Sequence, residues 1–432
     1  MIITGNSTRG LAGTTLGFFF GFAAVALYGP TATKFKEAME LSPALLGLLI
    51  AIPSLSGSLL RIPFGAWVDT TGGKKPFFIL LLLSVIGLGG VTLLLFTSYP
   101  DGMKGLYGLV LFFGFLSGCG IATFSVGIGQ TSYWFPRKRQ GFALGTFGGL
   151  GNLAPGIFSL VLPLFLTRFG FISAYFAWFL FLLTGTIIYG LIGVNAYYFQ
   201  FRKSGLSDTE ARLKASERGQ ELFPAGSIRD SLVNSARVTN TWALVALYFT
   251  TFGGFIALTA WFPTYWGEYQ NFSPVKAGLY TAVFSILASA MRVAGGSIAD
   301  KFGGEKVSLF AMTAILIAVA ALSFADSIPF SVAAVLLLAT GMGVANAAIF
   351  KLVAVYVPEA VGGAAGWIGG LGAFGGFALP PVMGAIAGKY GEIGYARGFL
   401  VFFVLAVLDL LIIYLLLNKR KKQLATLAEI NG

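Results

Sequence analysis

Twelve long apolar segments are the feature that most limits how this chain can fold. Each has about 20 residues or more, which is enough for a helix to cross a bilayer. Only helices and closed barrels satisfy their backbone hydrogen bonds inside hydrocarbon. The sequence therefore predicts an all-α integral membrane protein with twelve transmembrane helices. The segments cover residues 11–34, 44–68, 76–97, 104–134, 140–167, 172–200, 240–266, 275–299, 307–326, 329–357, 361–389 and 395–417.

Composition supports this class and removes several functions. Hydrophobic residues make up 56% of the chain and charged residues 11%, whereas soluble domains average about 25% charged. The chain has no histidine, which removes the usual zinc ligand and the easiest proton carrier near neutral pH. We expect no metal site and no cofactor. No apolar stretch with a cleavage site opens the chain, which predicts no removable signal peptide.

The net charge of +12 lies mostly in short loops, which indicates membrane topology signals and not a nucleic-acid partner. With a cytoplasmic amino terminus, the inner segments hold 19 Lys and Arg residues and the outer segments hold 7. Three more, Arg61, Arg292 and Lys351, lie inside apolar segments. The positive-inside rule predicts that both termini are cytoplasmic. We expect the bilayer to be the cell membrane.

The one long polar stretch, residues 201–238, follows the sixth segment. It predicts two six-helix halves, 1–200 and 239–418, joined by a cytoplasmic linker and followed by a basic tail, 419–432. Ser207 and Glu210 have the spacing of a capping box, so we expect a short surface helix in the linker.

An internal repeat relates the two halves. Arg61 and Arg292 are 231 residues apart, and the same offset relates the residues that follow them. A spacing kept over about a dozen residues indicates duplicated halves. The matching residues are Asp69 with Asp300 and Gly72 with Gly303, which we expect to form paired conformational loop motifs.

Two glycine-rich segments repeat in the same way, at 141–156 and 364–377. Gly148 and Gly149 match Gly369 and Gly370. Small residues let membrane helices approach closely, so these glycines indicate either plain packing or a backbone surface close to a small ligand. Asn152 adds a polar group that Ala373 does not match.

Depth along the predicted helices brings the polar residues together. Arg61 and Arg292 each lie about 12 Å from the aspartate that ends their helix. Phe124, Asn152, Tyr248, Phe252 and Lys351 also fall near the middle of the bilayer. Transporters built from repeats hold their substrate at this depth.

Two arginines without nearby carboxylates require an anion from elsewhere. A guanidinium is planar and offers forked donors, which suits a flat oxyanion. Phe124, Tyr248 and Phe252 are then either walls of the site or ordinary packing. Lys351 is a candidate for coupling or gating, with three roles open: attracting substrate, switching, or reaching the inner surface.

These motifs resemble the major facilitator superfamily, and within it the nitrate/nitrite porter family. Gly65-x-x-x-Asp69-x-x-Gly72-Gly73-Lys74 resembles the superfamily's loop motif. The arginine segments around Arg61 and Arg292, the two glycine segments, and the aromatics Phe124, Tyr248 and Phe252 resemble the porter family's signatures. The resemblance implies two pseudo-symmetric six-helix halves and alternating access. It also implies that nitrate or nitrite is held between the two arginines.

Other functions remain open at this point. A porter for another small anion, such as a carboxylate or an organic phosphate, also fits paired arginines. A membrane enzyme or sensor has no supporting motif. We expect nitrate/nitrite exchange, with proton-coupled nitrate symport as the alternative, and a protein that functions as a monomer.

Overall fold

The structure is a computed structural model that describes residues 3–136, 140–224, 228–357 and 361–431. It contains twelve helical spans long and apolar enough to cross a membrane, which confirms the predicted number. Arg137, Lys138 and Arg139, counted above as inner charges, and Pro358, which ends the tenth segment, lie outside the described residues.

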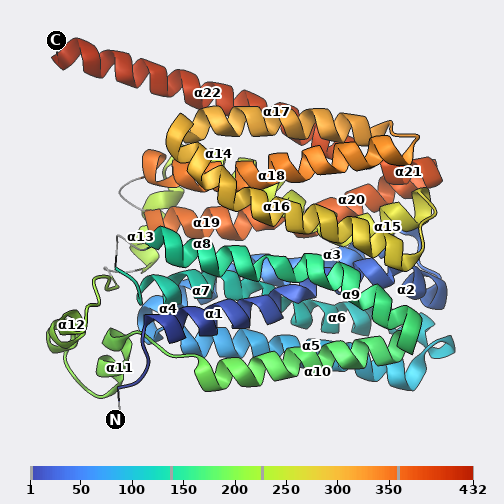
Figure 1. The fold of residues 1–432 in the computed structure, drawn as a ribbon, viewed down its shortest axis with the longest axis horizontal. Helices are drawn as coiled ribbons and strands as arrows, with labels where there is room; N and C mark the ends of the chain where they lie inside the picture. Colours follow the sequence, from blue (N-terminus) through green and yellow to red (C-terminus); the bar gives the residue numbers. More distant parts are fainter. Residues whose placement is uncertain (1–2, 137–139, 225–227, 358–360, 432) are drawn as a thin grey trace.

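The first six spans pack as one half of the bundle (Figure 1). In chain order, they consist of α1 (Ser7–Phe22), η1 (Ala23–Ala26), η2 (Gly29–Thr31) and α2 (Ala32–Met39); α3 (Pro43–Leu59) and α4 (Arg61–Thr71); α5 (Lys74–Ser98); η3 (Asp101–Leu106), α6 (Tyr107–Gly118), η4 (Cys119–Ala122) and α7 (Thr123–Ser132); α8 (Gln140–Gly151) and α9 (Leu153–Phe169); and α10 (Phe171–Ile192).

The last six spans form the other half. They consist of α14 (Thr239–Tyr248), η6 (Phe249–Gly253), α15 (Gly254–Thr264) and η7 (Tyr265–Tyr269); α16 (Pro274–Phe302); α17 (Gly304–Ser323); α18 (Ile328–Tyr356); α19 (Val361–Ala373) and α20 (Gly375–Tyr390); and α21 (Glu392–Arg397) and α22 (Leu400–Asn431). Between the halves lie α11 (Tyr197–Lys203), α12 (Asp208–Glu217) and α13 (Ile228–Ala236).

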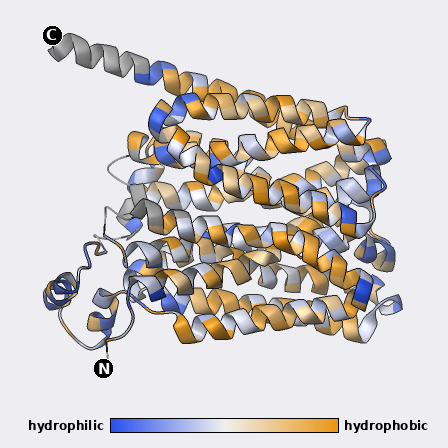
Figure 2. Ribbon diagram, viewed as in Figure 1, coloured by the Kyte–Doolittle hydropathy of each residue, from blue (hydrophilic) through white to orange (hydrophobic). Residues whose placement is uncertain are grey.

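Both termini and the helices α11, α12 and α13 lie at one end of the bundle, which we call the linker end (Figure 1). The opposite end, which carries α2 and α21, is the distal end. Figure 2 shows that hydrophobic residues dominate the spans, while hydrophilic residues gather at the two ends and in the linker. This distribution is what a bilayer requires of the surface of the bundle.

One predicted boundary is wrong. The sixth span was expected to run from 172 to 200, but α10 ends at Ile192, and the extended Gly193 separates it from α11. Residues 193–200 are apolar as well, so hydropathy did not show where the helix ends. The helix α22 continues through the predicted basic tail to Asn431. The predicted capping box at Ser207 and Glu210 is confirmed at the start of α12.

Several spans are interrupted near their middle. Arg61 begins α4 directly after the break at Leu60, and Pro63 removes an N–H that a continuous helix would use. The breaks at Asn152, between α8 and α9, and at Phe374, between α19 and α20, lie within the two glycine-rich segments. The seventh span contains a π-helical turn, η6, a feature often found at functional sites.

The two halves touch through backbone at the distal end. A Cβ at Gly384 of α20 would lie 2.5 Å from the Pro43 carbonyl oxygen of α3, and a Cβ at Gly278 of α16 would lie 2.0 Å from the Ser159 carbonyl oxygen of α9. Only glycine permits such approach. Gly149 of α8, on the linker side of Asn152, has more room, since its Cβ would lie 3.6 Å from Val293.

An ion pair also joins the halves at the distal end. Lys36 Nζ of α2 lies 2.7 Å from Glu268 Oε2 of η7. The side chains are 31% and 21% exposed, so the pair is partly shielded from solvent. Thr33 also donates to the Glu268 carboxylate, at 3.4 Å. The distal end is therefore closed by both close packing and charge.

The distal contact at Gly384 can be tested by adding bulk. We expect Gly384→Val to hold α3 and α20 apart, because overpacking at such a contact costs about 1–3 kcal/mol. A thiol at the buried Ser54 of α3, whose Cβ approaches Gly376 of α20, would then react about tenfold faster with a membrane-impermeant maleimide. The background protein is Ser54→Cys with Cys119→Ser.

Gly388→Val is the matched control, one turn further along α20. Its Cβ would meet Pro43 at an ordinary 3.7 Å, so labelling should stay near that of the background protein. Equal labelling rates in the two valine variants would show that the glycine contact does not hold this end closed.

Candidate functional site

Arg61 lies in the middle of the bundle at the start of α4. Its side chain is 1% exposed. Nε donates to the Gly57 carbonyl oxygen at 3.1 Å, and Nη1 donates to the Gly369 carbonyl oxygen at 3.1 Å. Gly57 belongs to the first half and Gly369 to the second, so this one side chain bridges the two halves.

Arg292 approaches the same place from α16. Its Nη2 lies 3.2 Å from the Tyr248 hydroxyl. The repeat pairs Arg61 and Arg292 across the two halves, and the structure brings both to the same place in the bundle.

An aromatic column stands between the two arginines. The Cζ atoms of Arg61 and Arg292 each lie 5.2 Å from the centroid of the Phe252 ring. They lie 5.0 and 5.9 Å from the centroid of Phe124. Phe124 and Phe252 stack across the boundary between the halves, with centroids 6.1 Å apart. Cation–π attraction to these ring faces offsets part of the cost of burying the two charges.

Tyr248 and Phe252 are four residues apart, a spacing that predicts one shared face of an α-helix. They do lie together, with stacked rings 4.9 Å apart, but η6 begins directly after Tyr248 and contains Phe252. Gly253 lets the helix widen into the π-helical turn beside the eleventh span, because a Cβ at this position would lie 2.5 Å from the Gly372 carbonyl oxygen. The close backbone approach of the eleventh span therefore fixes where the aromatic pair stands.

The two guanidiniums carry unused hydrogen-bonding capacity. Within the described residues, neither lies in a salt bridge with a carboxylate. Arg61 Nη2 and Arg292 Nη1 are buried and have no hydrogen-bond partner in the described structure. Leaving a buried charged donor unsatisfied costs more than 1–3 kcal/mol. Such a cost indicates a site that an anion completes.

A small cavity adjoins Arg292. It holds about 10 Å³, roughly the space of one water molecule. Asn152 and Asn346 are 2% and 3% exposed, and the amide oxygen of each has no partner within the described residues. The lining residues are Asn152, Phe252, Phe255, Ala288, Ser289, Arg292 and Asn346.

The predicted glycines divide into two groups. Gly369 has nothing within 4 Å of a Cβ, and at Gly148 a Cβ would lie 3.8 Å from Phe124. Gly149 likewise has ordinary space, as noted above. Gly370 is tight, since its Cβ would lie 2.7 Å from Ile62 beside Arg61. Gly370 therefore serves close packing, while the Gly369 backbone supplies a carbonyl to the site.

Lys351 lies apart from the arginine cluster. Its Nζ donates to the Ala299 carbonyl oxygen at 2.7 Å, and Ala299 is seven residues beyond Arg292 toward the linker end.

The paired loop motifs adopt matching turns at the linker end. Gly72 and Gly303 end their helices with φ of 77° and 89°, a conformation that favours glycine. Asp69 accepts a hydrogen bond from the Tyr133 hydroxyl. The backbone of Asp300 lies in α16, but its side chain lies outside the described residues.

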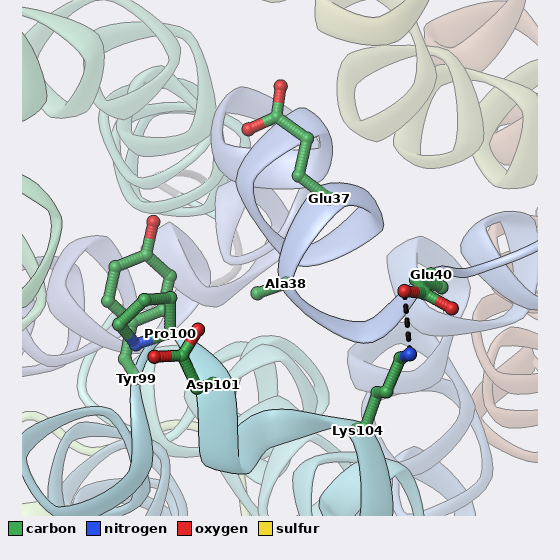
Figure 3. Close-up of a pocket in the computed structure, with 7 residues that line it drawn as sticks. All are labelled: Glu37, Ala38, Glu40, Tyr99, Pro100, Asp101 and Lys104. Atoms are coloured by element: carbon green, nitrogen blue, oxygen red, sulfur yellow. Dashed lines mark ion pairs between the residues drawn. The ribbon is translucent and has the colours of Figure 1, made fainter.

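A larger surface pocket lies at the distal end, away from the arginines (Figure 3). It holds about 350 Å³ and belongs to the first half. Its one basic residue, Lys104, is paired with Glu40 at 2.6 Å. Its lining is Glu37, Ala38, Glu40, Tyr99, Pro100, Asp101 and Lys104, so the carboxylates repel anions.

Sequence reasoning missed three residues of the centre. Phe18 of α1 and Phe147 of α8 pack around Phe124, with ring centroids 5.3 and 5.9 Å from it. Nothing in their local sequence distinguishes them from other core phenylalanines. Asn346 carried a usable signal, because it stands twelve residues before Pro358 just as Phe124 stands twelve before Pro136.

Comparison with known proteins agrees with this architecture. The sequence matches the Major Facilitator Superfamily over residues 14–380 and again over 278–431. Two solved structures share the fold at 14% identity: the xylose transporter XylE from E. coli (TM-score 0.71, covering 95% of this chain and 99% of that chain) and a D-xylose-proton symporter (TM-score 0.72, 94% and 97%).

Among curated relatives, the "Probable nitrate/nitrite antiporter NarK1" of Thermus thermophilus is 28% identical, over 95% of this chain and 91% of its own. The "Nitrite extrusion protein" of Bacillus subtilis is 27% identical, over 94% of each. The "Probable nitrate/nitrite transporter NarK2" of Mycobacterium tuberculosis is 31% identical, over 84% and 85%. The chain therefore belongs to the Major Facilitator Superfamily, and within it to the nitrate/nitrite porter family.

Proposed function

We propose that this protein is a secondary transporter that carries nitrate and nitrite across the cell membrane by alternating access. The names of its relatives, which include a nitrate/nitrite antiporter and a nitrite extrusion protein, support this substrate class. The linker end faces the cytoplasm, in keeping with the excess of Lys and Arg in that part of the sequence. The protein works as a monomer, since each copy contains both arginines.

One observation carries the proposal: two guanidiniums, one from each half, each with a buried terminal nitrogen that lacks a partner in the described structure. An anion placed between Arg61 and Arg292 satisfies both nitrogens and draws the halves together. The stacked rings of Phe124 and Phe252 lie beside both guanidiniums, and the planar fork of a guanidinium suits a planar ion.

The surroundings favour a small anion over a carboxylate or an organic phosphate. The cavity beside Arg292 has room for about one water molecule. Phe124, Tyr248 and Phe252 are all at most 4% exposed, so the aromatic column leaves no room for an organic body. An ion of three or four heavy atoms fits with small side-chain movements.

We expect Arg61→Lys and Arg292→Lys each to reduce nitrate uptake into proteoliposomes at least about 30-fold. Lysine keeps the charge but loses the forked donors, which bind a protein carbonyl or hydroxyl oxygen and the anion at the same time. Losing such a buried charged contact costs about 2 kcal/mol or more. Arg9→Lys, at the linker end, is the control and should transport normally. Near-normal uptake by either site variant would rule out this site.

Exchange follows from the charge of the empty site. Without an anion, two guanidiniums face the same two rings in a shielded interior. Repulsion between like charges grows as water is excluded. A bound monovalent anion relieves part of that repulsion, so the loaded carrier reorients more easily than the empty one. This difference favours nitrate entry coupled to nitrite exit.

The exchange mode is testable at equal pH on both sides. Liposomes that contain nitrite should take up nitrate quickly, and liposomes with only an impermeant buffer ion should take up little. The measurement is initial uptake of labelled nitrate, with protein-free liposomes as the blank. Equal initial rates in the two preparations would contradict exchange.

A second candidate, proton-coupled uptake, is favoured by one further residue. Asp409 of α22 is 3% exposed, and its Oδ2 has no hydrogen-bond partner within the described residues. Its carboxyl faces the Thr250 hydroxyl of η6, the turn that carries Phe252. A carboxyl that gains and loses a proton at this place would act on the segment that holds the aromatic column.

Proton coupling predicts concentrative nitrate uptake into nitrite-free liposomes under an inward proton gradient. Asp409→Asn would abolish the effect of the gradient, because the amide does not titrate. Asp326→Asn, in the exposed loop before α18, is the matched control and would keep it. Absence of gradient-driven uptake in the parent protein would remove this candidate and leave exchange.

A further inference from the structure

The sequence ends the fourth and tenth apolar segments alike, with Trp134-Phe135-Pro136 and Tyr356-Val357-Pro358, and this match also pairs two residues of the site. Phe124 stands twelve residues before Pro136, and Asn346 stands twelve before Pro358. Both side chains are buried, at 4% and 3% exposure. At the depth where the first half presents an aromatic ring to the arginines, the second half therefore presents an amide.

The packing of α18 against α16 holds Asn346 beside Arg292. A Cβ at Gly343 would lie 2.4 Å from the Ala288 carbonyl oxygen and 3.1 Å from the backbone nitrogen of Arg292. A Cβ at Gly295 would lie 2.7 Å from Val344 Cα. These backbone contacts leave α18 little freedom to move relative to Arg292, so the place of Asn346 is fixed.

Asn346 and Asn152 enter the same cavity from opposite halves. Both line it together with Arg292, and the amide oxygen of each lacks a partner within the described residues. An amide has two N–H donors beside its oxygen, and rotating the group by 180° exchanges the two ends. The cavity can thus offer donors that carry no net charge, next to the Arg292 guanidinium.

Two buried arginine nitrogens have no partner at all in the described structure, which is one for each oxygen of a two-oxygen ion. Arg61 uses Nε and Nη1 on carbonyl groups, and Arg292 uses Nη2 on Tyr248. One terminal nitrogen remains on each. Nitrite has two oxygens, so each unused nitrogen can bind one. Nitrate has a third oxygen, which needs a further donor once it is buried.

We propose that Asn346, acting with Asn152, donates to the third oxygen of nitrate and so makes the site prefer nitrate over nitrite. The proposal rests on the proposed function, since it deepens the recognition at the same site. Asn346 is then an uncharged binding residue in the second half that distinguishes an ion with three oxygens from an ion with two. Arg61 and Arg292 supply affinity for either ion, and the amides supply the difference.

Asn346→Leu is the main test, because leucine has nearly the shape of asparagine but no donor. We expect the apparent Kd for nitrate to rise about 10-fold or more, the loss typical of a hydrogen bond to a charged group. The Kd for nitrite should change less than about threefold. The measurement is the thermal stabilisation of the purified protein by sodium nitrate and by sodium nitrite, with sodium gluconate at equal ionic strength.

Ser308→Ala is the control, a buried hydroxyl in α17 that also lacks a partner in the described structure and does not line the cavity. It should leave the ratio of the two Kd values unchanged. If the leucine variant does not fold, Asn346→Ala takes its place with the same expected direction.

Each outcome bears on one proposal. Unchanged binding of both ions, or an equal loss of affinity for both, would overturn the selective role of Asn346. The amide would then bind an internal water and not the third oxygen of nitrate. If the parent protein were stabilised by neither ion, the proposed function would fail first. A nitrate-specific loss that also appears as a higher KM in liposome uptake would support the inference.

Discussion

Two positive charges in the middle of a membrane protein, with no negative charge beside them in the described structure, set the terms for the rest of this fold. Arg61 and Arg292 come from opposite halves and share the rings of Phe124 and Phe252. Backbone carbonyls, a phenol and ring faces satisfy part of each guanidinium. The nitrogens that stay without a partner cost free energy, and a bound anion removes that cost. The affinity for the anion and the preference of the loaded carrier for one conformation therefore have the same physical origin.

Glycine determines how the halves meet around that charge. At Gly384 and Gly278, backbone meets backbone across the distal end, and such contacts are lost almost completely when helices separate by a small distance. Gly369 contributes through its backbone, because its carbonyl oxygen accepts from Arg61 of the other half. Glycines therefore serve both the closing surfaces and the binding site, at different positions in the bundle.

Sequence alone was enough to predict the spans, the paired arginines and the capping box, because these depend on hydropathy, charge and spacing. It did not predict η6 or the breaks at Leu60, Asn152 and Phe374. These depend on which backbone groups find partners in other helices, as at Gly253 and Gly372. The roles of Phe18 and Phe147 were missed for a similar reason: forty-two phenylalanines occur in the chain, and only packing shows which ones surround the charge.

The ion pair between Lys36 and Glu268 makes the two faces of the bundle unequal. It joins the halves only when the distal end is closed, and its side chains are 31% and 21% exposed, so dissolved salt weakens it. At the linker end, the ion pair of Arg212 with Asp208 lies within the linker, and that of Arg420 with Glu305 lies within the second half. Dissolved salt on the distal side therefore weakens one of the contacts that hold the two halves together there. With the linker end in the cytoplasm, as we propose, a cell that moves from fresh to saline surroundings would loosen this contact from the outside alone.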